Sequence, residues 1–309
     1  MNTDQILLQF ADSLRLKGKS DMTIRAYMAD VERFCRDTCP ELPVVTREQL
    51  FTWDAAHAAR KISPATRTRY RVSIRLFLRF LEDRFDVQTP AGEIGTIRKG
   101  MSDPKFPHPE DVQEILHNCV RLETREDGTH YENPVHARDA AIFTLLLATG
   151  VRLSECRSLN CGSVSKRKVL HKGETITLWT VRISGVKPRH RERDINFGRA
   201  DDITDVATRH FGLWYLNRLQ RLGGYQAARN YPLFATDDDD ARRLATITIQ
   251  RLVKSVPRRA GRKDIADWIH PHSLRHFFGT YFKANDGDLL TIQRQMGHAN
   301  PVTTQQYIH

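Results

Sequence analysis

Three short polar segments hold residues whose types suit chemistry on a phosphate. Arg152 follows a glycine that is expected to end one helix, and it opens the next helix. His272 and Arg275 stand three positions apart, so they share one face of a predicted helix. His298 and Tyr307 are nine positions apart near the carboxyl end of the chain. Two guanidinium groups can bind both non-bridging oxygens of a phosphodiester and stabilise the charge that gathers there during attack.

A tyrosine can be the nucleophile of such a reaction only if its surroundings activate it. Its hydroxyl has a pKa of about 10, so only about one molecule in a thousand is ionised at pH 7. It therefore needs a proton acceptor and nearby positive charge, which a histidine and two arginines provide. Each residue has a simpler explanation when it is considered alone. An arginine more often forms a surface ion pair, and a histidine such as His270 or His276 more often has a structural role.

Taken together and in this order, the segments resemble the tyrosine recombinase family, whose members are also called phage integrases. The resemblance rests on T-G-x-R-x-S-E around Arg152, H-x-L-R-H around Arg275, the G-H pair that ends at His298, and Tyr307. It covers nearly the whole chain, because the helical amino-terminal part also looks like the core-binding domain of the family. The resemblance implies a site-specific DNA recombinase that joins itself to DNA through a 3′-phosphotyrosyl bond.

The resemblance also gives each residue of these segments a role. Arg152 and Arg275 match the two arginines that bind the phosphate, and Tyr307 matches the nucleophile. His272 matches the histidine that acts as general base or its equivalent. His298 matches a residue that hydrogen-bonds the phosphate.

Two further roles follow from the same resemblance. The family protonates the leaving 5′ oxygen with a lysine on a strand-turn-strand, and Lys187 is the lysine of the corresponding turn here. The family's G-K-G-x-K-E-R string is altered and a proline follows the lysine, so Arg189 and Arg191 could instead hold phosphates, with Lys172 as a distant substitute. Glu155 matches an acidic residue that orients the first guanidinium; the alternative is an ordinary carboxylate on a helix surface.

Residues 1–88 are predicted to form an all-α, SAM-like core-binding domain of four helices. Thr46 begins a capping box for the third helix, and Ser63 followed by a proline begins the fourth. The fourth helix carries an arginine at every fourth position, so its guanidinium groups form one winding stripe that could neutralise DNA phosphates. A solvated basic face is the alternative. The arginines of the stripe are Arg67, Arg71, Arg75 and Arg79.

Residues 89–108 are predicted to form a basic linker, because they are rich in glycine and proline and lack a hydrophobic period. Arg98 and Lys99 lie in this linker and could contact DNA. Residues 109–309 are predicted to form an α+β, mainly helical catalytic domain with a small antiparallel sheet, the DNA breaking-rejoining fold that the resemblance implies. The sheet should pair residues 175–183 with 193–197. Helices are expected over 111–120, 137–148, 203–222, 247–259, 273–284 and 289–296, with a last short helix after Asn300-Pro301 that carries the tyrosine.

The composition is that of a globular protein with an excess of positive charge. The 309 residues are 40% hydrophobic and 28% charged, and the net charge is +11 with a pI of about 9.6. An excess of Lys and Arg is typical of nucleic-acid binding, although it also serves solubility. No segment has the features of a signal peptide or a membrane span, so we expect a cytoplasmic, nucleoid-associated protein with no membrane partner. Five cysteines form no C-x-x-C pair, which favours reduced thiols over a zinc site.

Double-stranded DNA is the predicted partner. The resemblance implies a homotetramer on paired sites, and accessory DNA-bending proteins are a further partner class that it allows. No cofactor is expected, because a phosphotyrosyl bond keeps the energy of the cleaved phosphodiester, so neither ATP nor a metal is needed. The string Lys17-Gly-Lys-Ser20 lacks the earlier glycine of a nucleotide-binding loop, and His270 with His272 lacks the clustered Cys or carboxylate partners of a metal site.

Two other functions stay open at this point. A type IB topoisomerase-like nicking-closing enzyme would use the same residues without a partner duplex, and a relative that has lost catalysis would only bind DNA. The intact set of arginines, histidines and tyrosine disfavours the second. The resemblance fits integration of a mobile element, excision, resolution and inversion equally. Family members commonly continue beyond the tyrosine, whereas two residues follow Tyr307, which indicates either a shortened chain or another way of coupling subunits.

Overall fold

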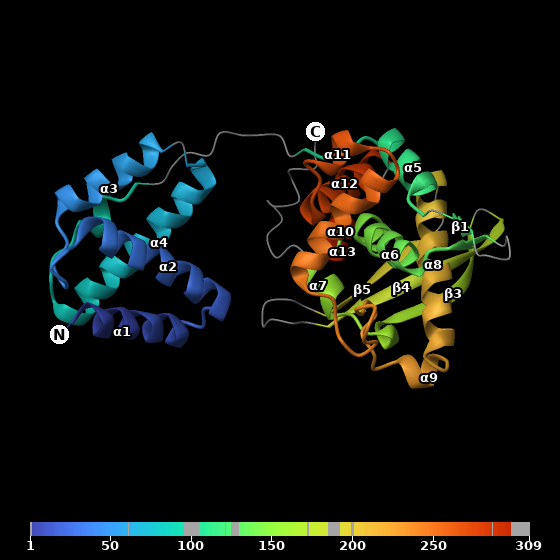
Figure 1. Ribbon diagram of the computed structural model, residues 1–309, viewed down its shortest axis with the longest axis horizontal. Helices are drawn as coiled ribbons and strands as arrows, with labels where there is room; N and C mark the ends of the chain where they lie inside the picture. Colours follow the sequence, from blue (N-terminus) through green and yellow to red (C-terminus); the bar gives the residue numbers. More distant parts are fainter. Residues whose placement is uncertain are drawn as a thin grey trace. The chain divides into compact units, whose positions relative to one another are not determined.

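The computed structural model describes residues 2–60, 62–95, 105–120, 122–124, 130–171, 173–184, 192–198, 201–285 and 287–297. The chain divides into two compact units, residues 1–102 and residues 103–309 (Figure 1). The described part of the first unit is helical, and the second unit combines helices with a small antiparallel sheet, as predicted. Within these described ranges, no helix is both long and apolar enough to cross a membrane.

The long helices of the first unit enclose an apolar core. Their bounds are α1 Thr3–Leu16, α2 Asp21–Thr38, α3 Arg47–Ala59 and α4 Pro64–Phe85, and the short 3-10 helix η1 follows at Pro90–Glu93. Capping residues mark where these helices begin. Thr46 and Gln49 form the predicted capping box of α3, and Ser63 caps α4. The largest fully buried side chains of this core include Phe10, Phe34, Ile74 and Phe77.

The chain that follows α4 packs onto the first unit for several residues. Ala91 and Ile94 are 2% and 7% exposed and belong to the same apolar core as α4. The sequence had placed residues 90–94 in the linker, because two apolar side chains in a short segment show no period. Residues 96–104, with Arg98 and Lys99, lie outside the described residues.

The sheet of the second unit has the strand order β3-β4-β5 and is antiparallel throughout. Its strands are β3 Val164–His171, β4 Glu174–Ile183 and β5 Arg193–Gly198, and β1 Leu122–Thr124 pairs separately with β2 His130–Glu132. The predicted pairing of β4 with β5 is present, with Trp179 opposite Phe197 and Ile183 opposite Arg193. β3 was not predicted, because most of its described side chains are exposed and it shows no alternation of apolar and polar residues.

The helices of the second unit lie close to their predicted positions. Each of the six predicted helices that falls within the described residues begins and ends within three residues of its expected bounds. The bounds are α5 Pro109–Asn118, α6 Pro134–Thr149, α7 Leu153–Ser158, α8 Asp202–Arg221, α9 Tyr225–Ala228, α10 Thr246–Arg259, α11 Lys263–Ala266, α12 Pro271–Ala284 and α13 Leu289–Met296, with the 3-10 helix η2 at Cys161–Ser163. The predicted last helix lies outside the described residues.

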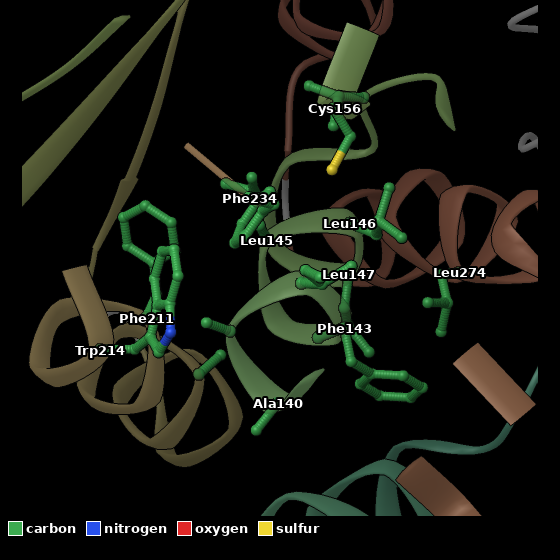
Figure 2. Packing of buried hydrophobic residues seen from close by; sticks show 14 of the residues in the cluster. Ala140, Phe143, Leu145, Leu146, Leu147, Cys156, Phe211, Trp214, Phe234 and Leu274 are labelled. Carbon is green, nitrogen blue, oxygen red and sulfur yellow. The ribbon is translucent and has the colours of Figure 1, made fainter. Parts of the chain in front are cut away.

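Helix α6 lies at the centre of the second unit, with α8, α10 and α12 packed around it (Figure 1). It is apolar on nearly every side, which is the pattern of a fully buried helix. Figure 2 shows Phe211 and Trp214 of α8 on one side of it and Leu274 of α12 on the opposite side. This packing fixes the carboxyl end of α6, from which the chain enters the candidate site.

Helix α6 ends at a glycine that no other residue could replace without strain. Gly150 has a φ of +59°, the left-handed conformation that glycine adopts freely. A Cβ atom at this position would lie 2.6 Å from Cδ1 of Phe278 on α12. The glycine therefore allows the end of α6 and the side of α12 to approach closely.

Candidate active site at the end of helix α13

Arg152 begins α7 and reaches across the unit to the end of α13. Its backbone N–H donates to Glu155 Oε2 at 2.9 Å, and its Nη1 donates to Glu155 Oε1 at 3.1 Å. Its Nη2 donates to the carbonyl oxygen of Gly297 at 2.8 Å. The contact that the sequence led us to expect between Arg152 and Glu155 is present. The side chain of Arg152 is 31% exposed, so it is only partly covered by protein.

Arg275 approaches the same place from α12. Its side chain is buried, and Nη2 donates to the carbonyl oxygen of Met296 at 2.7 Å while Nη1 donates to the carbonyl of Gly150. Arg152 and Arg275 therefore hold two successive carbonyls at the end of α13. The structure brings together the two predicted phosphate-binding arginines, although 123 positions separate them in the sequence (275 − 152).

A third arginine, Arg193, completes the cluster, and the sequence reasoning had not assigned it to the site. Its Nη1 and Nη2 donate to Glu155 Oε1 and Oε2 at 3.1 and 2.8 Å, and its Nε donates to the carbonyl oxygen of Gln295 at 2.8 Å. One signal could have found it. Arg193 alternates with Ile195 and Phe197 along β5, so it is on the strand face that points into the core.

Glu155 is the negative centre of this cluster. It is 1% exposed, and burial raises the pKa of its carboxyl group. The hydrogen bonds and charges of Arg193 and Arg152 outweigh burial and hold that pKa below its ordinary value. The carboxylate is therefore ionised at neutral pH. Three guanidinium groups against one carboxylate leave a net positive charge, which suits an anionic ligand such as a phosphodiester.

The two histidines of the predicted box, and His270 just before it, differ in their surroundings. His270 caps α12, because its Nδ1 accepts from the backbone N–H of Ser273 at 2.9 Å. His272 is exposed, and its Nε2 lies 3.0 Å from Nε2 of His276, which is buried one turn further along α12. At that distance one ring nitrogen donates and the other accepts. The cap gives His270 the structural role that we expected of it.

Both members of this histidine pair favour the neutral form. His272 is exposed as a whole residue, but partial removal of its imidazole from water lowers its pKa, and the charges of Arg275 and His270 lower it further. Burial also lowers the pKa of His276 to about 4, with further contributions from His272 and Arg275. His272 is therefore neutral at pH 7, which is the form that can accept a proton.

Several predicted residues lie outside the described residues, and their roles stay predictions. They are Arg98, Lys99, Lys172, Lys187, Arg189, Arg191, His298 and Tyr307. Two of them are nevertheless close in sequence to residues of the site. Lys187 belongs to the connection between β4 and β5, whose last pair joins Ile183 to Arg193 of the cluster. His298 directly follows Gly297, whose carbonyl Arg152 holds.

Three of the four arginines in the stripe on α4 contact other groups of the protein. Arg71 donates to both carboxylate oxygens of Asp54 at 3.1 and 2.5 Å, and Arg67 lies 3.7 Å from the same carboxylate. Arg75 donates to the carbonyl of Ile94. The hydrogen bond from Arg71 lowers the pKa of the Asp54 carboxyl despite partial burial. Arg79 is exposed, and the DNA-contact role of the stripe stays a prediction.

The part of the chain that the structure describes contains no group of three or more His, Cys, Asp or Glu placed to hold a metal ion. The cluster offers guanidinium and imidazole groups that can act on an anion.

In comparisons with known proteins, a family model matches most of the second unit, and related proteins match up to nearly the whole chain. The model of the phage integrase family matches residues 105–309. The chain is 29% identical to tyrosine recombinase XerC of Alcanivorax borkumensis over 238 residues, a match that covers 77% of this chain and 66% of that protein. It is 27% identical to tyrosine recombinase XerD of Listeria monocytogenes over 299 residues, which covers 95% of this chain and 89% of that protein.

Solved structures with the same fold are also recombinases and integrases. A lambda integrase dimer bound to a COC′ core site is similar with a TM-score of 0.69 and 13% identity, over all of this chain and 77% of that one. The XerH site-specific recombinase bound to difH substrate is similar with a TM-score of 0.64 and 18% identity, over 93% of this chain and 77% of that one. At these identities the likeness supports the fold.

Proposed function

We propose, from the premise that this chain belongs to the phage integrase family, that it is a site-specific DNA recombinase which cuts and rejoins strands through a 3′-phosphotyrosyl intermediate. One observation carries the proposal. Arg152, Arg193 and Arg275 converge with Glu155 at the end of α13 and keep a net positive charge beside a neutral histidine. Such a site binds a phosphodiester and stabilises the additional charge of its transition state.

In the proposed reaction the hydroxyl of Tyr307 attacks a scissile phosphate. Arg152 and Arg275 bind the non-bridging oxygens, and neutral His272 accepts the phenolic proton directly or through water. A new bond forms between the tyrosine oxygen and phosphorus, and the bond from phosphorus to the 5′ oxygen breaks. Lys187 gives a proton to that leaving oxygen, so that a free 5′-hydroxyl results.

The second half of the reaction is the reverse of the first. A 5′-hydroxyl, from the same strand or from a partner duplex, attacks the phosphotyrosyl bond and releases Tyr307. The number of phosphate ester bonds does not change, so no outside energy source is required. His298 follows the carbonyl that Arg152 holds and is proposed to hydrogen-bond the same phosphate.

Double-stranded DNA is the proposed substrate, held by phosphate contacts from both units. Arg79, Arg98, Lys99, Arg189 and Arg191 are proposed to supply such contacts, which position the duplex without selecting its sequence. We propose a homotetramer on two paired sites, because exchange between two duplexes needs one nucleophile for each of four strands. Accessory DNA-bending proteins would act on the same assembly.

The proposal is tested by trapping the covalent intermediate. Duplexes that the protein selects from a random-sequence pool are rebuilt with a nick beside the cleavage position, so that a short fragment diffuses away after cleavage and the intermediate accumulates. The wild-type protein should become joined to DNA, and Tyr307→Phe should not. Tyr225→Phe, which changes an exposed tyrosine on α9, is the matched control and should behave as wild type.

Two outcomes would overturn the proposal. Equally little trapped DNA with wild type and Tyr307→Phe would favour a relative that only binds DNA, whereas equally abundant trapped DNA would mean that another residue is the nucleophile. Relaxation of supercoiled plasmid by a monomer, without any product that joins two duplexes, would instead support a nicking-closing enzyme of the type IB topoisomerase kind.

A further inference from the structure

We propose that Arg193 is a positioning residue of this site: it balances the charge of Glu155, so that the charge of Arg152 stays available to the DNA phosphate. This inference rests on the proposed function. It assigns a part in phosphate binding to β5, at the arginine that ends the segment matched to the family's G-K-G-x-K-E-R string and to which the sequence analysis gave no role.

The first argument is the way in which the carboxylate of Glu155 is shared. Oε1 accepts from Nη1 of Arg193 at 3.1 Å and from Nη1 of Arg152 at 3.1 Å. Oε2 accepts from Nη2 of Arg193 at 2.8 Å and from the backbone N–H of Arg152 at 2.9 Å. Arg193 thus makes a two-pronged contact with both oxygens, whereas the guanidinium of Arg152 uses a single prong. The other prong of Arg152 is directed to the carbonyl of Gly297.

The second argument is burial. The side chain of Arg193 is 11% exposed and that of Glu155 is 1% exposed, so their charges are poorly screened by water. The side chain of Arg152 is 31% exposed. If Arg193 were neutral, the buried carboxylate would have Arg152 as its closest remaining cation among the described residues, and it would attract that guanidinium away from a ligand. With Arg193 present, the charges of Arg193 and Glu155 cancel each other, and the positive charge of Arg152 remains in excess.

The third argument is that the position of Arg193 is itself held firmly. Its Nε donates to the carbonyl oxygen of Gln295 at 2.8 Å, so one guanidinium joins β5, α7 and the end of α13. Gly297 has a φ of +65°, and a Cβ atom there would lie 2.8 Å from Cζ of Arg193. The glycine leaves the space that the guanidinium needs.

This charge balance can be tested by asking whether a second substitution restores the cleavage rate that the first one lowers. Arg193→Gln should bind its DNA site within a few-fold of wild type, but cleave a nicked substrate about 10- to 100-fold more slowly in a single turnover, as when an outer partner of a functional group is removed. Glu155→Gln combined with Arg193→Gln removes one charge of each sign and restores the net charge of the cluster. The double variant should therefore cleave faster than Arg193→Gln alone. Arg193→Lys keeps the charge and should recover part of the rate.

The matched control lies on the same sheet. Arg182 of β4 forms an exposed ion pair with Asp194 of β5, and both side chains are largely in water. Arg182→Gln removes an arginine–carboxylate pair of the same kind without touching the cluster, so it should cleave within about twofold of wild type, since exposed pairs contribute little. Thermal unfolding of every variant shows whether it is folded.

A second measurement does not depend on cleavage. Inorganic phosphate is titrated into the full chain, and the side-chain NMR signals of Arg152 report binding, assigned with Arg152→Lys. Wild type should bind phosphate more tightly than Arg193→Gln, on the order of tenfold for the loss of one nearby charge, and the double variant should regain affinity. If wild type trapped no DNA, the proposed function would fail while this titration still decided the role of Arg193.

The inference is overturned by any of three results. They are cleavage by Arg193→Gln at the wild-type rate, a folded double variant that is slower than Arg193→Gln, and equal phosphate affinity of Arg193→Gln and wild type.

Discussion

Arg152 donates a 2.8 Å hydrogen bond to the carbonyl oxygen of Gly297, a residue 145 positions later in the chain. Arg275 holds the preceding carbonyl, that of Met296, at 2.7 Å. The two arginines that match the phosphate-binding pair of the family are thereby tied to the residue that directly precedes His298. Binding of a phosphate by these guanidinium groups would therefore affect the hydrogen bonds that hold the end of α13.

Removing the guanidinium of Arg275 should reduce both cleavage and stability. Arg275→Gln is expected to lower the single-turnover cleavage rate by about 10²–10³, the cost of one preorganised donor. It also leaves the carbonyls of Gly150 and Met296 without this donor, which should lower the free energy of unfolding by about 1–3 kcal/mol. Nicked-substrate cleavage and denaturant unfolding measure the two effects. Arg294→Gln, at an exposed position of α13, should change neither; a loss of the same size there would contradict this account.

The buried histidine of α12 should make the protein less stable in mild acid. The pKa of His276 is lowered from 6.5 to about 4, so the unfolded chain takes up its proton first as the pH falls. The free energy of unfolding should therefore decrease between pH 6.5 and pH 4, by about 1–3 kcal/mol for this group. His276→Gln should flatten that part of the profile in denaturant unfolding. His117→Gln, at an exposed position of α5, should leave the profile unchanged, and a steeper fall in His276→Gln would refute the sign.

Two glycines with positive φ should respond differently to alanine. Gly150→Ala meets both the left-handed backbone and the ring of Phe278 at 2.6 Å, so it should lower the free energy of unfolding by about 2–4 kcal/mol. Gly173→Ala has a φ of +83° and open space around it, so it should cost only about 1–2 kcal/mol. Denaturant unfolding compares them. Gly150→Ala should also slow cleavage, because the carbonyl of Gly150 accepts from Arg275. Equal losses at the two positions would mean that the contact with Phe278 is readily relieved.

The arginines of α4 should contribute unequally to DNA binding. Arg79→Gln is expected to lower the slope of log affinity against log salt by about 1, the value for one phosphate contact. Arg71→Gln should lower it less, because Asp54 already balances the charge of Arg71. Asp54→Asn should strengthen binding at low salt by freeing that charge. Fluorescence anisotropy with a labelled duplex at several salt concentrations measures all three, and a larger effect at Arg71 than at Arg79 would reverse the assignment.

Much of the fold could be predicted from the sequence, because its signals are local. The capping box of Thr46 and the cap of Ser63 act within four residues, and the apolar periods of α8, α10, α12 and α13 run along single helices. The pairing of β4 with β5 follows from two alternating segments joined by a short connection. β3 gave no such signal, because an exposed strand is stabilised by its partner and not by its own pattern.

The amino-acid sequence by itself determined which chemical groups are present and which helices and strands present them: two arginines, three histidines and a tyrosine in recognisable strings. Only the tertiary structure decided that Arg193 joins them, that Glu155 lies between two guanidinium groups, and that α4 shares its charge with Asp54. The physical reason is that these contacts depend on how separate elements pack; Arg193 and Glu155, for example, are 38 positions apart. Their energies depend on burial and on the geometry of packed elements, and neither quantity is a property of any single stretch of chain.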